Sequence, residues 1–188
     1  MEPNTKPDSL RMDISSKKKR VKYDEVFAPV ARYETIRAFL ACCVEMHVHQ
    51  MDVEAAYVQG TLVNEIYMTQ PETFIDSNQP GKVCKLNRPL YGLKQAGRQW
   101  YKEIDKHLTT MNFEKSAASS CVYISKNSDV TIVLYVDDLL IGSKSIDRII
   151  RTKNILKSKF KIKDLGQVRD ILGMQIDRDG QTGSIRLP

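Results

Sequence analysis

Apolar positions along the chain follow two different periods, which divide the sequence into predicted helices and strands. Apolar residues three or four positions apart, the spacing of one helix face, occur at residues 35–44, 100–111 and 145–159. Shorter apolar or alternating runs predict strands at residues 48–53, 65–68, 83–86, 122–124, 131–136, 139–141, 160–163, 171–176 and 184–187, and residues 55–59 predict one short helix. This mixed order predicts an α+β fold in which helices pack on one face of an antiparallel sheet.

The first 22 residues show neither period. They are polar, carry prolines and end in a basic run, Lys-Lys-Lys-Arg-Val-Lys, at residues 17–22. Such a composition cannot bury enough apolar surface to fold, so we expect a disordered segment over residues 1–22 and one folded domain over residues 23–188. The basic run resembles a nuclear localisation signal or a phosphate-contacting patch, and a solvated charge run explains it at least as well.

Composition narrows the class of protein only a little. The 188 residues include 29 Lys and Arg against 23 Asp and Glu, and the net charge of +6 favours a polyanionic partner such as nucleic acid. The four cysteines form no CxxC motif and lie at no zinc-like spacing from a histidine, so we expect reduced core thiols in an intracellular protein. No apolar run approaches the roughly 20 residues of a membrane span.

Two adjacent carboxylates interrupt the most apolar stretch of the chain, TIVLYVDDLLIGS at residues 131–143. An Asp-Asp hairpin turn is the ordinary explanation, because Asp tolerates turn geometry. The continuous apolar flanks, however, predict a buried hairpin, where neighbouring carboxylates repel each other and lose hydration. A divalent cation such as Mg²⁺, which prefers oxygen ligands, would relieve that repulsion. Both interpretations of Asp137 and Asp138 stay open on this pattern alone.

A third carboxylate, Asp52, stands at the end of the predicted strand 48–53, immediately before the short helix. A strand end places a side chain at the rim of a sheet, where it can join Asp137 and Asp138. The alternative is that Asp52 caps the helix that follows, as Asp often does. The strand pattern does not separate these two roles.

From Tyr23 onward the chain resembles the reverse transcriptase domain of copia-type LTR retrotransposons. The matching segments keep the family's order and spacing: YDEVFAPVARYETIR (23–37), QMDVEAAYVQGTL (50–62), EIYMTQPE (65–72), LNRPLYGLKQAGRQWY (86–101), LYVDDLLIGS (134–143), FKIKDLG (160–166) and ILGMQI (171–176). The resemblance implies the palm of a right-hand polymerase, with an antiparallel sheet and packed helices. It also implies an RNA-directed DNA polymerase of a Pol polyprotein, acting on an RNA or DNA template-primer and deoxynucleoside triphosphates.

The resemblance assigns roles to individual residues. It implies that Asp52, Asp137 and Asp138 hold two Mg²⁺ ions, with Mn²⁺ as an alternative, and so catalyse nucleotidyl transfer. Asp138 would be less directly involved than Asp137, because adjacent strand residues point to opposite faces. Tyr57, five positions after Asp52, resembles a steric gate that favours deoxynucleotides, and a core tyrosine is the alternative.

Further contacts are implied by the same resemblance. Those to the nucleotide are Val53, Tyr57, Tyr91, Gly92 and Lys94. Gly92 would allow a close backbone approach and Lys94 would meet a phosphate, unless Gly92 makes a turn and Lys94 is solvated. Phosphate contacts are expected at Arg32, Arg37 and Lys163, with Lys161 or Lys163 as a proton donor near the pyrophosphate. The segment LGMQI resembles the primer grip.

The sequence departs from the family at three places. The basic region that usually precedes YDEVFAPV is reduced and no thumb segment follows, so we expect truncated fingers and no thumb. Gly97 stands where relatives commonly carry proline, which predicts a less rigid helix start. A non-catalytic, transposon-derived nucleic-acid-binding protein and an unstable pseudogene product therefore remain alternatives. We expect a cytoplasmic particle or the nucleus as location, other Pol segments as further partners, and no membrane association.

Overall fold

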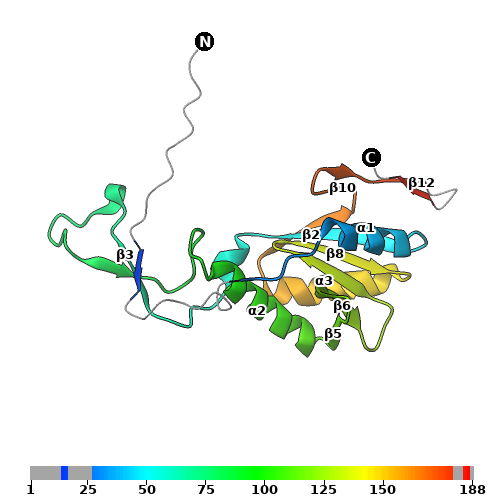
Figure 1. The fold of residues 1–188 in the computed structure, drawn as a ribbon, viewed down its shortest axis with the longest axis horizontal. Coiled ribbons are helices and arrows are strands. Elements are labelled where there is room, and N and C mark those ends of the chain that lie inside the picture. The colour runs from blue at the N-terminus through cyan, green and yellow to red at the C-terminus, as the bar shows by residue number, and fades with distance from the viewer. Residues whose placement is uncertain (1–13, 17–26, 180–183, 187–188) are drawn as a thin grey trace, which may run out of the picture.

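The computed structural model describes residues 14–16, 27–179 and 184–186. Their largest element is a six-stranded antiparallel sheet with the order β5-β6-β7-β8-β2-β9 (Figure 1). Its strands are β2 (His47–Val53), β5 (Phe113–Ser116), β6 (Ser119–Ser125), β7 (Thr131–Tyr135), β8 (Asp138–Ser143) and β9 (Ile162–Gln167). The predicted α+β fold with an antiparallel sheet is confirmed, although β5 is not among the predicted strands.

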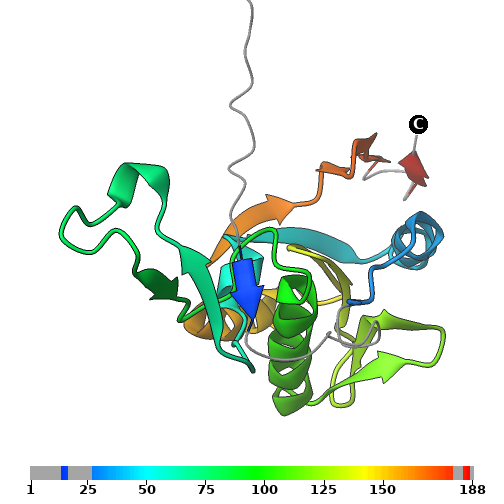
Figure 2. The same cartoon turned by 60° about the vertical axis from the view of Figure 1, so that its left-hand side comes forward.

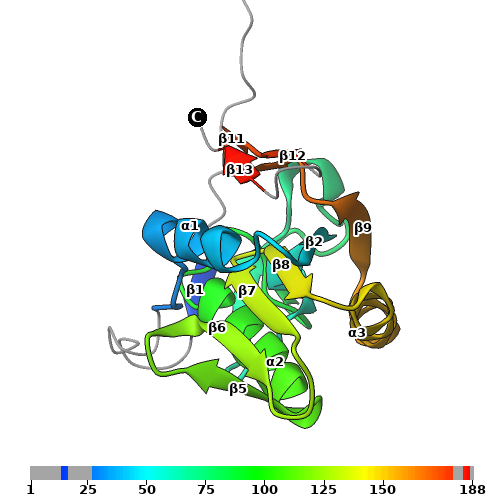
Figure 3. The ribbon, with the colours of Figure 1, turned by 90° about the vertical axis from the view of Figure 1, so that its right-hand side faces the viewer.

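The α-helices cover both faces of this sheet, so the prediction that helices pack on one face is wrong. The helix α1 (Tyr33–Cys42) lies on one face, and α2 (Ala96–Thr110) and α3 (Ile146–Lys159) lie on the other (Figure 3). The alternation along β8 shows why, because Leu139 and Ile141 join the core with α2 and α3 while Leu140 joins the core with α1. A strand that is apolar on both sides needs cover on both sides.

The core under α2 and α3 is the larger of the two. It contains Trp100, Ile104 and Leu108 of α2 and Ile149 and Leu156 of α3, all essentially inaccessible to solvent. On the other face, α1 approaches β8 closely at Gly142, where an added Cβ would lie 2.8 Å from the Cys43 sulfur and 2.9 Å from the Phe39 ring. The glycine therefore sets how near α1 can pack to the sheet.

A second, smaller sheet projects from the body of the molecule (Figure 2). It has the order β1-β3-β4, from β1 (Ile14–Ser16), β3 (Ile66–Thr69) and β4 (Val83–Lys85), with the short 3₁₀ helix η3 (Glu72–Phe74) between β3 and β4. The strand β1 belongs to the segment expected to be disordered, so for Ile14–Ser16 that expectation is corrected. The basic run at 17–22 lies outside the described residues.

Two short hairpins complete the described chain, β10 (Asp170–Ile171) with β11 (Met174–Gln175) and β12 (Asp177–Asp179) with β13 (Ser184–Arg186). Ile171 and Ile176 are buried in the core under α1, which places the first hairpin on the α1 face of the sheet. None of the helices in the described part of the chain is long and apolar enough to cross a bilayer.

Candidate active site

Strand β2 lies between β8 and β9, and its last residues carry the acidic rim of the sheet. Asp52 stands directly opposite Asp138 of β8 and directly opposite Lys163 of β9. Residues opposite each other in an antiparallel pair project from the same face. That face is the α1 face, because Val48 and Leu140, which share the alternation of Asp52 and Asp138, lie in the core under α1. Asp52 therefore lies at the rim predicted for it.

The turn between β7 and β8 consists of Val136 and Asp137, one residue earlier than the predicted Asp-Asp turn. Val136 has φ +55°, which is strained for a β-branched residue. Two bonds hold the turn: Trp100 Nε1 donates to the Val136 carbonyl at 2.6 Å, and the Val53 N–H donates to the Asp137 carbonyl at 2.9 Å. The shift places Asp138 inside β8 and Asp137 at the tip of the hairpin.

Asp138 is partly buried and its carboxylate accepts a hydrogen bond of 3.0 Å from Gln50 Nε2. Burial raises the pKa of Asp138, the nearby charges of Asp137, Asp52 and Asp170 raise it further, and the Gln50 bond opposes them. Among the side chains that the structure describes between residues 27 and 177, no cation forms an ion pair with Asp52, Asp137 or Asp138. The three carboxylates at the rim therefore have no cationic partner among the side chains described.

The donor chemistry of this rim fits a hard divalent cation, since it supplies carboxylate oxygens and no sulfur or imidazole. Asp52 and Asp138 are neighbours by register, and Asp137 is one residue away in a hairpin held at Val136 and Val53. As the side chains are placed, however, no group of three His, Cys, Asp or Glu residues in the described ranges closes into a ligand set. The structure thus brings the three expected residues to one rim, with Asp52 and Asp138 side by side and Asp137 in the adjoining turn.

An aromatic pair borders the acidic rim. Tyr57, in the 3₁₀ helix η2 (Ala56–Gln59), stacks on Tyr91 with ring centroids 4.8 Å apart and an angle of 35° between the rings. Burial raises the pKa of Tyr91, and the charge of Asp137 raises it further. Tyr57 is partly buried and packs against the core with α2 and α3, next to Tyr91, so its role as a steric gate stays a prediction beside the core alternative.

The other expected nucleotide contacts have different surroundings. The Val53 side chain is buried in the core with α2 and α3, on the face away from Asp52, so only its backbone reaches the rim. Gly92 has φ +94° in a turn, with open space around its Cβ position, so the turn itself favours glycine and the close approach to a nucleotide stays a prediction. Lys94 is exposed and makes no ion pair with the residues described.

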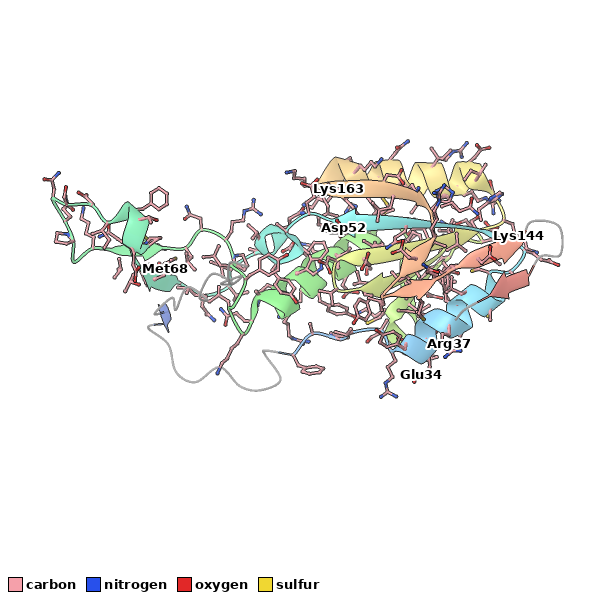
Figure 4. All side chains as sticks on the ribbon, turned by 90° about the horizontal axis from the view of Figure 1, so that it is seen from above. Glu34, Arg37, Asp52, Met68, Lys144 and Lys163 are labelled. Atoms are coloured by element: carbon pink, nitrogen blue, oxygen red, sulfur yellow. The ribbon has the colours of Figure 1, made fainter. Side chains whose placement is uncertain are left out.

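The expected phosphate contacts are divided between two places. Lys163 lies beside Asp52, and its ammonium is 3.9 Å from Glu54, which also pairs with Lys161 at 2.6 Å (Figure 4). Arg32 precedes α1 and Arg37 lies on its exposed surface, across the molecule from Lys163 in Figure 4. Arg37 therefore lies away from the acidic rim, and neither arginine forms an ion pair with Asp52, Asp137 or Asp138.

Two residues at the rim are absent from the sequence-based prediction. Gln50 binds Asp138, and its signal is available in the sequence, because Gln50 and Asp52 are two positions apart on one strand and so share a face. Trp100 fastens the Val136 carbonyl, and nothing in the local sequence indicates that bond, because it joins residues 36 positions apart.

The sheet, its helical cover on both faces and a rim of three aspartates at a strained hairpin define an α+β domain with a candidate metal site. The profile of the family described as reverse transcriptase (RNA-dependent DNA polymerase) matches residues 14–188. The chain belongs to this reverse transcriptase family.

Relatives agree with that membership. The chain is 42% identical over 167 residues to the retrovirus-related Pol polyprotein from transposon TNT 1-94 of Nicotiana tabacum, covering 86% of this chain and 13% of that protein. It is 38% identical over 160 residues to the retrovirus-related Pol polyprotein from transposon RE1 of Arabidopsis thaliana, covering 83% of this chain and 11% of that protein. The resemblance to copia-type Pol proteins is confirmed, and the chain spans about an eighth of the length of these relatives. No solved structure matches the chain.

Proposed function

We propose that this chain carries the nucleotidyl-transfer site of an RNA-directed DNA polymerase, with Asp52, Asp137 and Asp138 as its metal-binding carboxylates. The observation that supports it best is the β2–β8 register, which sets Asp52 opposite Asp138 on one face with Asp137 in the adjoining turn. Membership of the reverse transcriptase family supplies the reaction class. Two Mg²⁺ ions, when bound, would acidify the primer 3′-hydroxyl and neutralise the triphosphate and leaving pyrophosphate.

The protein's own residues contribute position and charge. The strained Val136 turn is fixed by Trp100 and the Val53 N–H, which holds the Asp137 backbone before substrate arrives. Gln50 orients the Asp138 carboxylate. Preorganised groups act without reorganisation at the moment of reaction, and that is how positioning lowers a barrier.

We assign substrate selection to the aromatic pair and a phosphate contact to Lys163 of β9. The Tyr57 ring, stacked on Tyr91 beside the acidic rim, would exclude a ribose 2′-hydroxyl, a role that this neighbourhood supports. Lys163, opposite Asp52, would contact a phosphate or donate a proton to pyrophosphate, a role that its register supports. The partners proposed are a template-primer of RNA or DNA, deoxynucleoside triphosphates and other Pol segments, in a cytoplasmic particle or the nucleus.

Primer extension on an RNA template with Mg²⁺ tests this function. The protein should incorporate deoxynucleotides, and Asp137→Asn should lower the rate at least 100-fold, because removing a metal ligand should exceed the roughly 10–100-fold effect of disturbing a ligand's supporting partner. Asp147→Asn, an exposed change in the first turn of α3, is the matched control and should extend primers normally.

Two outcomes would overturn the proposal. The first is that Asp137→Asn, folded as judged by circular dichroism, extends primers as fast as the unaltered protein. The second is no extension at all by a folded protein that binds RNA equally well with or without Asp137→Asn. That second result would identify a non-catalytic nucleic-acid-binding protein.

A further inference from the structure

A polar groove of about 540 Å³ lies at the same end of the sheet as the acidic rim, between η2, α2 and the junction of α3 with β9. Its lining residues are Val58, Gln59, Thr61, Arg88, Glu103, Lys159, Phe160 and Lys161. Small-molecule and polymer sites commonly have volumes of roughly 300–1,000 Å³, so the groove is larger than one phosphate requires.

The charge of the groove is positive. Arg88 lines the groove from the segment after β4, Lys159 and Lys161 line it from the junction of α3 with β9, and Glu103 of α2 is the acidic residue of the lining. Lys161 is paired with Glu54 just outside the lining, at 2.6 Å. Arg88 and Lys159 form no ion pair with any residue that the structure describes, so two cations remain available to an external anion.

The wall of the groove is fixed by Gln59 rather than left to a loose loop. The Gln59 side-chain amide donates to the Glu54 carbonyl at 2.7 Å and to the Lys161 carbonyl at 2.9 Å, and its oxygen accepts the Lys161 N–H at 2.9 Å. These bonds continue the β2–β9 pairing one step past its end, where the Glu54 N–H also donates to the Lys161 carbonyl. The Lys161 backbone is therefore held in place before any ligand binds.

The groove is continuous with the acidic rim through β9. Lys161 borders the groove, and Lys163, two residues later, stands opposite Asp52. The Glu54 carboxylate lies within ion-pair range of both lysines. A ligand in the groove would thus lie beside the end of β9 that reaches the acidic rim.

We propose that this groove binds phosphate groups of a nucleic-acid strand where the strand passes the edge of the sheet, with Arg88 and Lys159 as the principal contacts. The assignment of a nucleic acid, rather than a free polyphosphate, rests on the proposed function, which makes a template-primer the partner of this chain. The cations and their geometry stand independently of it. A lysine near the C-terminus of a helix stabilises the helix itself, and this effect alone could account for Lys159 at the end of α3. It does not account for Arg88.

The salt dependence of binding to a labelled short single-stranded DNA tests the groove. For the double variant Arg88→Ala/Lys159→Ala, the slope of log K against log salt should become shallower by about 1.4, which is roughly 25-fold weaker binding at 0.1 M salt. The control Lys144→Ala/Arg151→Ala removes two exposed charges elsewhere on or before α3 and should leave the slope unchanged.

A variant that is expected to strengthen DNA binding excludes misfolding as the cause of the change in affinity. Glu103→Gln removes the acidic side chain of the groove and should strengthen DNA binding roughly two- to fivefold, the range of one surface charge interaction. Inorganic tripolyphosphate at equal phosphate concentration should displace the DNA only weakly, since it can occupy the groove alone.

Three results would overturn the inference: equal slopes for the groove and control variants, no gain with Glu103→Gln, or full displacement by tripolyphosphate, which would identify a free polyphosphate site. None of these measurements requires catalysis. Loss of primer extension with the groove effects intact would refute the proposed function alone, and normal extension with equal slopes would refute the groove alone.

Discussion

Asp164 and Asp138 lie on the two strands that flank β2, β9 and β8, and on opposite faces of the sheet. They differ in whether cationic side chains surround the carboxylate. Asp164 of β9, on the α3 face, accepts bonds from the buried Lys153 ammonium at 2.5 Å, from the Gly166 N–H at 3.0 Å and from Lys157 at 3.2 Å. Asp138 of β8, on the α1 face, has the neutral amide of Gln50 and further acidic groups around it.

The pKa values record that difference. Burial would raise the pKa of Asp164, but the Lys153, Gly166 and Lys157 bonds outweigh it and lower the pKa to about 2. Burial raises the pKa of Asp138 and the neighbouring carboxylates add to the rise. On the α3 face, lysines of α3 therefore neutralise the charge of Asp164. On the α1 face the carboxylates at the rim keep a negative charge, which a bound cation would neutralise.

The largest expected effect separates the two faces by activity. Asp52→Asn should lower primer extension at least 100-fold, because it removes a proposed metal ligand, while its thermal stability without Mg²⁺ stays equal or rises, because repulsion at Asp138 is relieved. Asp164→Asn should do the reverse, losing stability while the folded fraction keeps its activity. Parallel extension assays and melting curves check both.

The opposite outcomes for the two variants would contradict this contrast between the faces. An Asp52→Asn protein that melts well below the unaltered protein would show that Asp52 is a structural residue; it is not a helix cap, because the 3₁₀ helix η2 has no side-chain cap. An Asp164→Asn protein that is stable but inactive would place Asp164 in the site instead.

The two faces should also respond oppositely to an added methyl group. At Gly142, on the α1 face, the new Cβ would meet the Cys43 sulfur at 2.8 Å and the Phe39 ring at 2.9 Å, so Gly142→Ala should destabilise the fold by about 1–3 kcal/mol. At Gly97, on the α2 side, the Cβ would rest 3.6 Å from Tyr57 and 3.7 Å from Ala28, in ordinary contact. Gly97→Ala should therefore stabilise by up to about 0.5–1 kcal/mol.

Urea unfolding of both variants measures these changes. Equal destabilisation by the two substitutions would mean that α1 does not pack as closely as the structure has it. The stabilising outcome at Gly97 would also show that this glycine loosens the start of α2.

The sequence predicts the strands and helices of the sheet well where the apolar period is long. The predicted segments 48–53 and 145–159 correspond to β2 and α3 within one residue at each end. The one-face prediction failed although its correction was visible, because strands 131–136 and 139–141 are apolar without interruption, and such strands are buried on both faces.

In the candidate site, likewise, features set by residues close in sequence were predictable, and features set by contacts between distant segments were not. A strand end predicts Asp52 at the rim, and a hairpin predicts Asp137 and Asp138 close to it. The one-residue shift of the turn was not predictable, because it depends on the Trp100 bond to Val136, made between distant segments. The pairing of Lys153 with Asp164 is equally hidden, since both are ordinary surface residues by pattern and only the packing of α3 on β9 buries the lysine.

The last expected effect concerns pH and tests whether Lys153 and Lys157 neutralise Asp164 on the α3 face as described. The pKa of Asp164 is about 2 in the folded protein against an ordinary value of 3.8, so its ion pair stabilises the fold above about pH 4 and that stability is lost as the pH falls towards 2. His49, whose ring nitrogen lies 2.6 Å from Lys153, has a pKa lowered by burial and then by Lys153. Its protonation therefore removes stability at a higher pH, as the pH falls below about 6.5.

Asp164→Asn isolates the lower step, because asparagine resembles a protonated aspartate and keeps an acceptor for Lys153. The variant should be less stable than the unaltered protein by about 1–2 kcal/mol at pH 5, and the difference should vanish near pH 2, while the loss due to His49 persists in both proteins. Denaturant unfolding across this range measures the difference. A gap that remains constant down to pH 2 would show that Asp164 stabilises by packing and not by charge, and the contrast with Asp138 would then be one of shape rather than of neutralisation.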